Sequence, residues 1–348
     1  MTRSRAFVLI TLGISLALAS LSPLGVSQAQ APRFEIKLAH ADPPDVYTSR
    51  KAASSTVFKQ IVESETGGAV AVNLYPAGQL GGETQLAQAV KLGTLQMAMV
   101  SGAFSQFCRE AQVFDMPYLF PSYTVAWKVL DGPFGQELAK QCLQETGMRI
   151  LEYGQVGFRN FTNSVRPIRT PADLKGLKIR VQPAPVYLAL VKSMGASPTP
   201  VEWTETYSAL QQKVVDGEEN PVSTIQFAKL YEVQKYLTLD GHTYGVSFML
   251  INEKFFQGLP KNIQAIVQDA ARTAQVVEDG DDTLNSSIGI QFLQNKGMDV
   301  YVPTAAQMGQ FKAVAQPAVM AYLEKQIGRA WIDKALRAVK EAEASLEK

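Results

Sequence analysis

The chain has 348 residues, of which 46% are hydrophobic, 9% aromatic and 19% charged, and its formal net charge is +1. The near-neutral charge argues against nonspecific binding of nucleic acid, and two histidines and two cysteines leave little material for a zinc site or a redox motif. The length suits two lobes of about 100 to 200 residues each. We therefore expect a globular protein without a metal, a cofactor or a nucleic-acid partner.

An apolar segment opens the chain. Arg3 and Arg5 precede an apolar run over 6–21, and Ser27-Gln28-Ala29 forms a small-x-small cleavage site. The run is shorter than the about 20 apolar residues that a membrane span needs, and serines interrupt it. We therefore expect residues 1–29 to be a cleaved signal peptide of an exported protein, rather than an uncleaved membrane anchor.

Strand-like and helix-like patterns alternate in the first third of the chain. Alternation of apolar and polar residues predicts strands over 34–38, 70–74 and 97–100, and helical spacing predicts helices over 49–65 and 83–92. Strand, helix and strand in this order imply right-handed crossovers and a mostly parallel sheet covered by helices. The fold class expected from this pattern is α/β.

A second unit of the same kind begins near Gly157. It contains a strand over 177–181, helices over 185–194 and 204–214, and a later strand over 246–252. No repeat of fixed period or flexible linker divides the chain, so several strand crossings are expected to join the two units.

A very long helical pattern follows, over 260–295. Gly280 and Gly289 are expected to bend it, and a helix of this length would run across both lobes. Its expected buried face consists of apolar residues at helical spacing: Ile263, Ile266, Val267, Ala270, Ala274, Val277, Leu284, Ile288 and Phe292.

The two cysteines, Cys108 and Cys142, are compatible either with one disulfide in an oxidising compartment or with two buried thiols, because sequence does not give the Cα separation.

The sequence lacks the catalytic motifs that we searched for. His40 and His242 lie far apart in the sequence, no serine stands in a Gly-x-Ser-x-Gly motif, and the glycine-rich segment 78–83 lacks the Lys-Ser/Thr of a phosphate loop.

Six short segments together carry a family resemblance, and their order and spacing make it specific. They are Leu-Tyr-Pro-Ala-Gly-Gln-Leu-Gly at 74–81, Asp-Met-Pro-Tyr-Leu-Phe at 115–120, Gly-Phe-Arg-Asn-Phe-Thr-Asn at 157–163, Asp-Leu-Lys-Gly-Leu-Lys-Ile-Arg-Val at 173–181, Gly-Ala-Ser-Pro-Thr-Pro at 195–200 and Asp-Gly-Glu-Glu-Asn-Pro at 216–221. With them the chain resembles the DctP-type solute-binding proteins of tripartite ATP-independent periplasmic (TRAP) transporters.

The resemblance implies a two-lobed periplasmic binding protein fold with a long helix linking the lobes. Lobe I would comprise 30–156 with a return segment near 246–285, and lobe II 157–245 completed by about 286–348. The implied function is a receptor, not an enzyme and expected to be a monomer, that delivers a small organic acid to TRAP permease subunits. A sensor or receptor for another transport system and, less favoured, an exported enzyme remain the alternatives.

The resemblance also assigns the carboxylate contacts. Arg180 matches the arginine that grips the ligand carboxylate, because a guanidinium offers two parallel N–H donors. Arg159 matches a second arginine and Asn220 an amide that hydrogen-bonds the carboxylate. The structural alternatives are a surface ion pair for Arg180, an ion pair within the lobe for Arg159 and a turn cap for Asn220. Glu219 is expected to be the partner of an arginine rather than a ligand contact.

Four further positions complete the expected ligand site. Trp203 matches an aromatic that packs against the ligand body, with an ordinary core tryptophan as the alternative. Glu83 and Ser101 match positions that reach polar ligand groups, and His40 lies in the first cleft-facing loop. The segment Gln182-Pro183-Ala184-Pro185 departs from the family pattern, which suggests a missing polar contact. Together with Trp203 opposite, this favours a less polar acid over a polyhydroxylated sugar acid.

Overall fold

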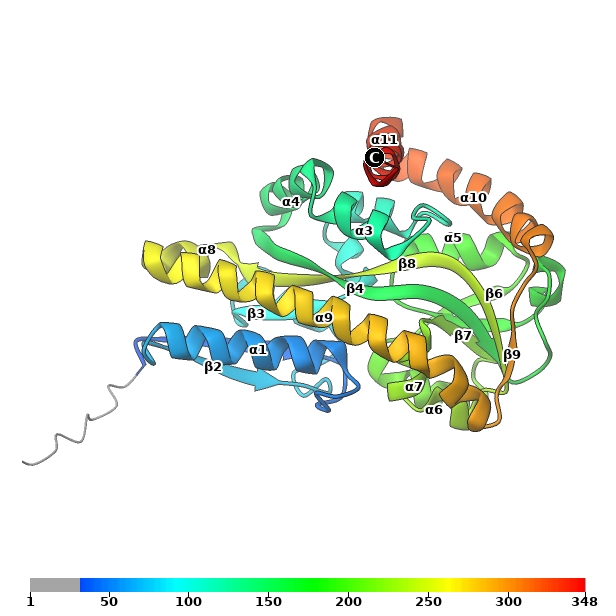
Figure 1. Cartoon of the computed structure of the whole chain (residues 1–348), viewed down its shortest axis with the longest axis horizontal. Helices are drawn as coiled ribbons and strands as arrows, with labels where there is room; N and C mark the ends of the chain where they lie inside the picture. The colour runs from blue at the N-terminus through cyan, green and yellow to red at the C-terminus, as the bar shows by residue number, and fades with distance from the viewer. Residues whose placement is uncertain (1–31, 348) are drawn as a thin grey trace, which may run out of the picture. The chain divides into compact units, whose positions relative to one another are not determined.

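The computed structural model describes residues 32–347, so the expected signal peptide lies outside the described residues. Within them the strands form one mixed sheet (Figure 1). The strands are β1 (Phe34–His40), β2 (Val70–Tyr75), β3 (Met97–Val100), β4 (Met148–Asn163), β5 (Lys178–Val181), β6 (Ser197–Pro200), β7 (Gly217–Asn220), β8 (Tyr236–Asn252) and β9 (Asp299–Tyr301). Their order is β2-β1-β3-β8-β4-β7-β5-β6, and β9 pairs with β8.

Two groups of parallel strands flank a central antiparallel pair. β1 pairs in parallel with β2 and β3, and β5 pairs in parallel with β6 and β7. We call the first group with its helices the first lobe and the second group the second lobe. The long strands β4 and β8 pair with each other and join the lobes through antiparallel contacts with β7 and β3. The sheet is therefore mixed, whereas the sequence predicted a mostly parallel one.

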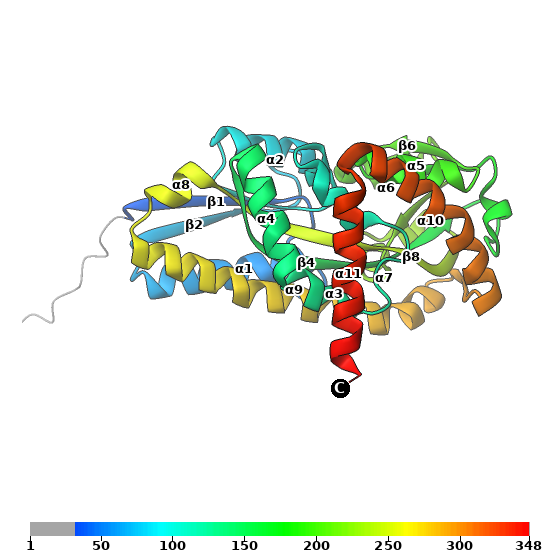
Figure 2. The same cartoon turned by 90° about the horizontal axis from the view of Figure 1, so that it is seen from above.

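Helices cover both faces of this sheet (Figures 1 and 2). Alternate residues of one strand point to opposite faces, so Met97 and Met99 of β3 pack with α1 and α9, whereas Ala98 and Val100 belong to the core on the other face. The helices are α1 (Arg50–Glu65), α2 (Glu83–Leu92), α3 (Tyr123–Leu130), α4 (Pro133–Thr146), α5 (Pro185–Ser193), α6 (Thr206–Gln211), α7 (Val222–Phe227), α8 (Glu253–Gly258), α9 (Lys261–Asn295), α10 (Ala305–Ile327) and α11 (Arg329–Leu346).

The two C-terminal helices pack on different parts of the fold. α10 packs against α5 of the second lobe, and α11 then lies over α3 and α4 (Figure 2). The sequence-based boundaries placed this whole segment in the second lobe and put a boundary between residues 156 and 157, which falls inside β4. The exact division of the chain between the lobes stays a prediction.

The helix α9 runs continuously for 35 residues through Gly280 and Gly289. At about 1.5 Å per residue it is about 50 Å long, and it contacts α1, β4, α7 and β9. It therefore links the first lobe to the second, as expected. Gly289 serves close packing, since a Cβ there would lie 2.6 Å from Cγ1 of Val222 in α7.

The buried face of α9 is polar in its second half, which corrects the predicted apolar stripe. Leu284 and Ile288 are 59% and 53% exposed, whereas Glu278, Asp279 and Asp282 are buried. These carboxylates face β4 where it has glycines. Added Cβ atoms at Gly154 and Gly157 would lie 2.4 Å from Oε2 of Glu278 and 2.7 Å from Oδ2 of Asp282, respectively.

The bulge of β4 between Gln155 and Gly157 explains why an acid is buried there. At a bulge a backbone N–H loses its ladder partner, and the N–H of Gln155 donates instead to Oδ1 of Asp279 at 2.8 Å. The side chain of Gln155 donates to Oδ2 of Asp282 at 2.6 Å. The carboxylates of α9 thus satisfy polar groups where the central strands are irregular.

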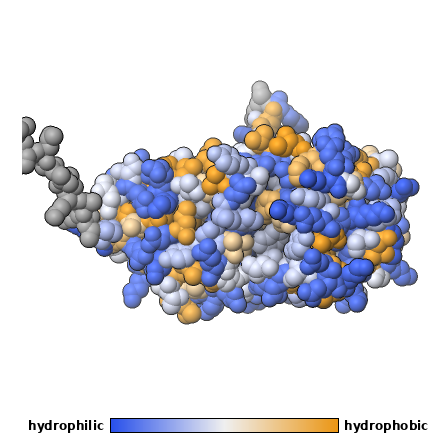
Figure 3. Space-filling model, turned by 90° about the horizontal axis from the view of Figure 1, so that it is seen from below, coloured by the Kyte–Doolittle hydropathy of each residue, from blue (hydrophilic) through white to orange (hydrophobic). Residues whose placement is uncertain are grey.

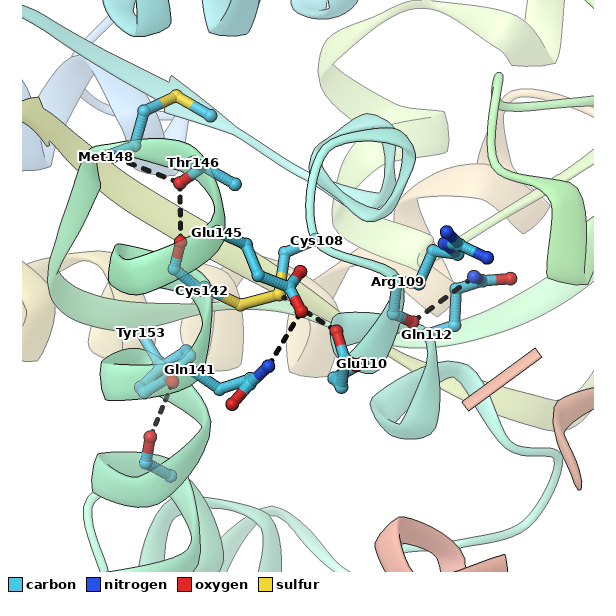
Figure 4. Close-up of a disulfide and its surroundings, with 11 residues drawn as sticks. Cys108, Arg109, Glu110, Gln112, Gln141, Cys142, Glu145, Thr146, Met148 and Tyr153 are labelled. Carbon is cyan, nitrogen blue, oxygen red and sulfur yellow. Dashed lines mark hydrogen bonds between the residues drawn. A yellow bond between two sulfur atoms is a disulfide. The ribbon is translucent and has the colours of Figure 1, made fainter. Parts of the chain in front are cut away.

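Cys108 and Cys142 form a disulfide with a Cα–Cα distance of 5.3 Å, which resolves the choice that sequence left open (Figure 4). It ties α4 to the 3₁₀ segment that begins at Arg109.

Among the described helices, none has the length and apolarity that crossing a bilayer requires. On the face drawn in Figure 3, hydrophobic residues form small groups separated by hydrophilic ones.

Candidate functional site

A cavity lies between the lobes, where β3, β5 and β7 end. The ends of parallel strands are a common position for ligand sites in α/β sheets. The lining side chains come from both lobes and from β4: Asp42, Arg50, Glu83, Ser101, Val156, Arg159, Arg180, Gln182, Pro183, Glu202, Trp203, Asn220 and Thr224.

Hydrogen bonds join the two lobes beside the cavity. Nη1 of Arg50 in α1 donates to Oγ1 of Thr224 in α7 at 3.0 Å. The backbone N–H of Gly102, just after β3, donates to Oε1 of Gln182 at 3.2 Å. A ligand held here would be surrounded by protein, which strengthens electrostatic contacts by excluding water.

Arg180 is the buried guanidinium of this cavity that lacks an acid. It belongs to β5 and is 1% exposed. Its Nε and Nη2 donate to the carbonyl oxygen of Val201 at 2.9 and 2.7 Å, and its guanidinium carbon lies 5.8 Å from the ring centroid of Trp203. Among residues 32–347, no carboxylate oxygen lies within 4.0 Å of it, and Nη1 has no hydrogen-bond partner.

Burial lowers the pKa of Arg180 to about 10, although the nearby Glu219 and Glu218 oppose the shift. The guanidinium therefore stays charged at neutral pH. A buried charge without a partner is costly, and a ligand carboxylate would compensate it.

Arg159 also lines the cavity but is already neutralised. Its Nε and Nη2 donate to Oε2 and Oε1 of Glu219 at 2.5 and 2.9 Å, and Nη2 also donates to the Glu219 backbone carbonyl. Burial favours the neutral acid, yet the Arg159 charge and a hydrogen bond from His242 hold the pKa of Glu219 below its usual range. Arg159 therefore forms the ion pair within the lobe that was the structural alternative to a ligand contact. Its partner is Glu219, which was expected to pair with an arginine.

Asn220 and Trp203 complete the wall on the side of the second lobe. Asn220 ends β7, and its Nδ2 donates to Oε2 of Glu218. Trp203 begins a short 3₁₀ turn and is half-buried, with its ring 6.1 Å from that of Phe227. Both residues line the cavity, and their contact with a ligand stays a prediction.

Glu83 and Ser101 form the wall on the side of the first lobe, together with Lys51 behind them. Glu83 is the first residue of α2, where an acidic side chain is favourable. Its Oε1 accepts from Nζ of Lys51 at 2.6 Å and from Oγ of Ser101 at 3.1 Å, and its Oε2 accepts from the Ser101 backbone at 2.8 Å. The buried charge of Lys51 thus neutralises Glu83.

His40 is the one predicted ligand contact that the structure does not place at the cavity. The side chain is 1% exposed, with Nε2 at 3.4 Å from Oγ of Ser55. Burial lowers the pKa of His40 to about 4, so the ring is neutral at neutral pH. Its position at the end of β1 made it a candidate, but its side chain is packed behind the wall.

Sequence reasoning missed Arg50, Asp42, Glu202 and Thr224, which also line the cavity. For Arg50 the sequence offered one signal, namely the adjacent basic residues Arg50 and Lys51 at the start of α1. Gln182 corrects an expectation, since its amide lies on the wall where a polar contact was thought to be missing. The argument for a less polar acid then depends on Trp203 alone.

Comparisons with known proteins agree on one family. The DctP model, described as bacterial extracellular solute-binding protein, family 7, matches residues 39–326. A solute-binding protein of Verminephrobacter eiseniae is 37% identical over 287 residues, which cover 82% of this chain and 84% of the relative.

Two solved structures are similar over nearly their whole length. A TRAP periplasmic solute binding protein from Bordetella bronchispeptica, with density assigned to pantoate, is 34% identical with a TM-score of 0.81, covering 87% of this chain and 98% of that one. The sugar acid binding protein from Advenella mimigardefordensis in complex with galactonate is 32% identical with a TM-score of 0.85, covering 90% and 99%.

Proposed function

Because the chain belongs to the DctP family of bacterial extracellular solute-binding proteins, we propose that it is a periplasmic receptor that captures a small organic acid between its lobes. The receptor then delivers the acid to the membrane subunits of a TRAP-type secondary transporter. The family binds small carboxylates and works with such membrane components. We propose that the protein carries out no reaction on its ligand.

The single observation that carries this proposal is the buried, charged Arg180 without an acid within 4.0 Å in the described chain. A guanidinium has five N–H groups, and two N–H···O contacts hold it against Val201. The remaining donors suit the two oxygens of a carboxylate in the bidentate geometry that arginine favours. We therefore assign Arg180 as the carboxylate anchor.

The other cavity residues have supporting roles in this proposal. Arg159, held by Glu219, contributes positive potential near the carboxylate, and Asn220 contributes an amide beside it. Trp203 packs against the body of the ligand, and Glu83 and Ser101 contact its polar groups. The carboxylates named with the two solved relatives, pantoate and galactonate, support a site of this chemistry.

Thermal unfolding of the mature chain tests the proposal. The chain is first freed of co-purified ligand by unfolding and refolding, and its Tm is then measured with pantoate or galactonate and with the matching neutral amide or lactone. A ligand that binds only the folded state stabilises it by about 2.7 kcal/mol at a hundredfold excess over Kd. We expect acids to raise Tm and neutral forms to leave it unchanged. An equal shift by both forms would contradict the carboxylate anchor.

A further inference from the structure

The charges on the first-lobe wall of the cavity cancel each other. Nζ of Lys51 lies 2.6 Å from Oε1 of Glu83 and 3.9 Å from Oδ1 of Asp42, and Nη2 of Arg50 lies 3.6 Å from Oδ2 of Asp42. All four side chains are buried. Burial favours neutral acids, yet the charges of Lys51 and Arg50 hold the pKa of Asp42 below its usual range. Two cations therefore face two anions on this wall.

The second-lobe wall leaves one cation free. Arg159 is paired with Glu219, whereas Arg180 has no carboxylate within 4.0 Å in the described chain. Glu202, on the same wall, adds another carboxylate, and its Oε2 has no hydrogen-bond partner among the described atoms. Arg180 is thus the lining cation that has no acid within 4.0 Å in the described chain and can compensate one ligand carboxylate, whereas the three lining acids Asp42, Glu83 and Glu202 disfavour a second one.

The same acids retain positions that can accept hydrogen bonds. Oδ2 of Asp42 is buried and has no hydrogen-bond partner in the described structure. Oε2 of Glu83 accepts only from the Ser101 backbone, and a carboxylate oxygen can accept two hydrogen bonds. A ligand hydroxyl donates where these oxygens accept, whereas a methylene would leave them unpaired at a cost.

We propose that the ligand is a hydroxylated monocarboxylate and that Glu83, held by Lys51 and Ser101, selects it by accepting from a ligand hydroxyl and repelling a second carboxylate. This inference rests on the proposed function, because it assumes that Arg180 holds the first carboxylate. It assigns to Glu83 the discrimination between monocarboxylic and dicarboxylic acids.

Calorimetric titration with acids of matched length tests the selection. Erythronate and tartrate are hydroxylated four-carbon acids with one and two carboxylates, butyrate and succinate are their counterparts without hydroxyls, and galactonate and galactarate form a six-carbon pair. At pH 7.5 we expect each hydroxylated monocarboxylate to bind at least 100-fold more tightly than the dicarboxylate of its length. Butyrate is expected to bind at least 10-fold more weakly than erythronate.

The variant Glu83→Gln should shift this preference. It keeps the side-chain shape and leaves Asp42, 3.9 Å away, as the one acid within 4.0 Å of Lys51 in the described chain, so a second ligand carboxylate gains a partner. We expect the ratio of dicarboxylate to monocarboxylate affinity to rise at least 10-fold. The matched control is Glu253→Gln, which removes the acid of another ion pair, Arg149–Glu253, neither residue of which lines the cavity. It should leave the ratio unchanged.

The outcomes separate the two proposals. If no acid binds, both the proposed function and this inference are wrong. If acids bind but succinate, tartrate or galactarate binds as tightly as its monocarboxylate, the receptor function survives and the selection is overturned. Butyrate binding as tightly as erythronate would also overturn it. The wild-type ratios decide the question even if Glu83→Gln does not fold.

Discussion

Replacing Arg180 by alanine removes the proposed anchor and should abolish tight binding without destabilising the empty protein. A carboxylate seated on the free edge of the guanidinium would gain two charge-assisted hydrogen bonds, each contributing about 1.5–3 kcal/mol. Their loss amounts to about 3–6 kcal/mol, which raises Kd at least about 100-fold. Arg180→Lys keeps the charge but lacks the planar fork, so it should recover only part of the affinity.

The stability of the ligand-free variants provides the internal control. Arg180→Ala removes a buried charge that has no ion-pair partner but leaves the Val201 carbonyl without its donors, so the two effects oppose each other. Arg159→Ala instead removes the closer of the two cations beside the buried Glu219 and leaves only His242, whose Nε2 lies 3.3 Å from Oε2 of Glu219, so we expect a loss of folding stability that reaches at most about 3–5 kcal/mol. We expect the empty Arg180→Ala protein to be close to wild type in stability and the Arg159→Ala protein to be clearly weaker.

Calorimetric titration with erythronate or galactonate measures the Kd values, and urea unfolding of the ligand-free proteins measures the free energies. A wild-type Kd for a folded Arg180→Ala variant would refute the assignment of the anchor. A large loss of stability in Arg180→Ala together with none in Arg159→Ala would refute the charge pairing on which the reasoning depends.

Three further predictions concern stability. Replacing both Cys108 and Cys142 by serine should cost about 3–4 kcal/mol in urea unfolding, because the disulfide closes a long loop of the unfolded chain; a change within experimental error would show that the loop is constrained in other ways. Gly157→Ala should cost about 1–3 kcal/mol, since the residue has a φ of +103° and the new Cβ would lie 2.7 Å from Oδ2 of Asp282; the same measurement would show no loss if the strand can shift. Burial raises the pKa of Asp279 to about 8, and Glu278 adds to the shift. At pH values between about 4 and 8 the folded state therefore binds more protons than the unfolded state. The contribution of Asp279 to folding stability thus falls as the pH rises through this range. Asp279→Asn should therefore flatten the decline in Tm across this range, and an unchanged slope would assign the decline to other groups.

Local signals were sufficient for several elements. The helix α2 was predicted with its observed bounds because its helical pattern runs up to Gly93, which ends it with a φ of +76°. The strand β3 was also predicted as observed, and α9 was predicted to begin at Pro260, one residue before its first helical residue. Each of these depends on neighbouring residues alone, so a sequence pattern can identify it.

The central strands and the polar face of α9 could not be predicted in this way. β4 and β8 are long because they pair with each other across the middle of the chain, and only a short part of β8 has a strand-like pattern of its own. The face of α9 that is buried depends on the glycines of β4, which contact it from more than 100 residues away. Apolar periodicity instead predicted burial of Leu284 and Ile288, because it takes no account of what the helix packs against.

The candidate site shows the same division. Resemblance to a family placed Arg180, Arg159 and Trp203 near a ligand, and the folded chain brings them to one cavity. Sequence reasoning left open whether either arginine is neutralised, because the answer depends on acids from other strands. Glu219, 60 residues from Arg159, reaches that guanidinium, and no described acid comes within 4.0 Å of Arg180. The charge left free for a ligand is therefore set by contacts between residues far apart in the sequence, and these exist only once the chain has folded.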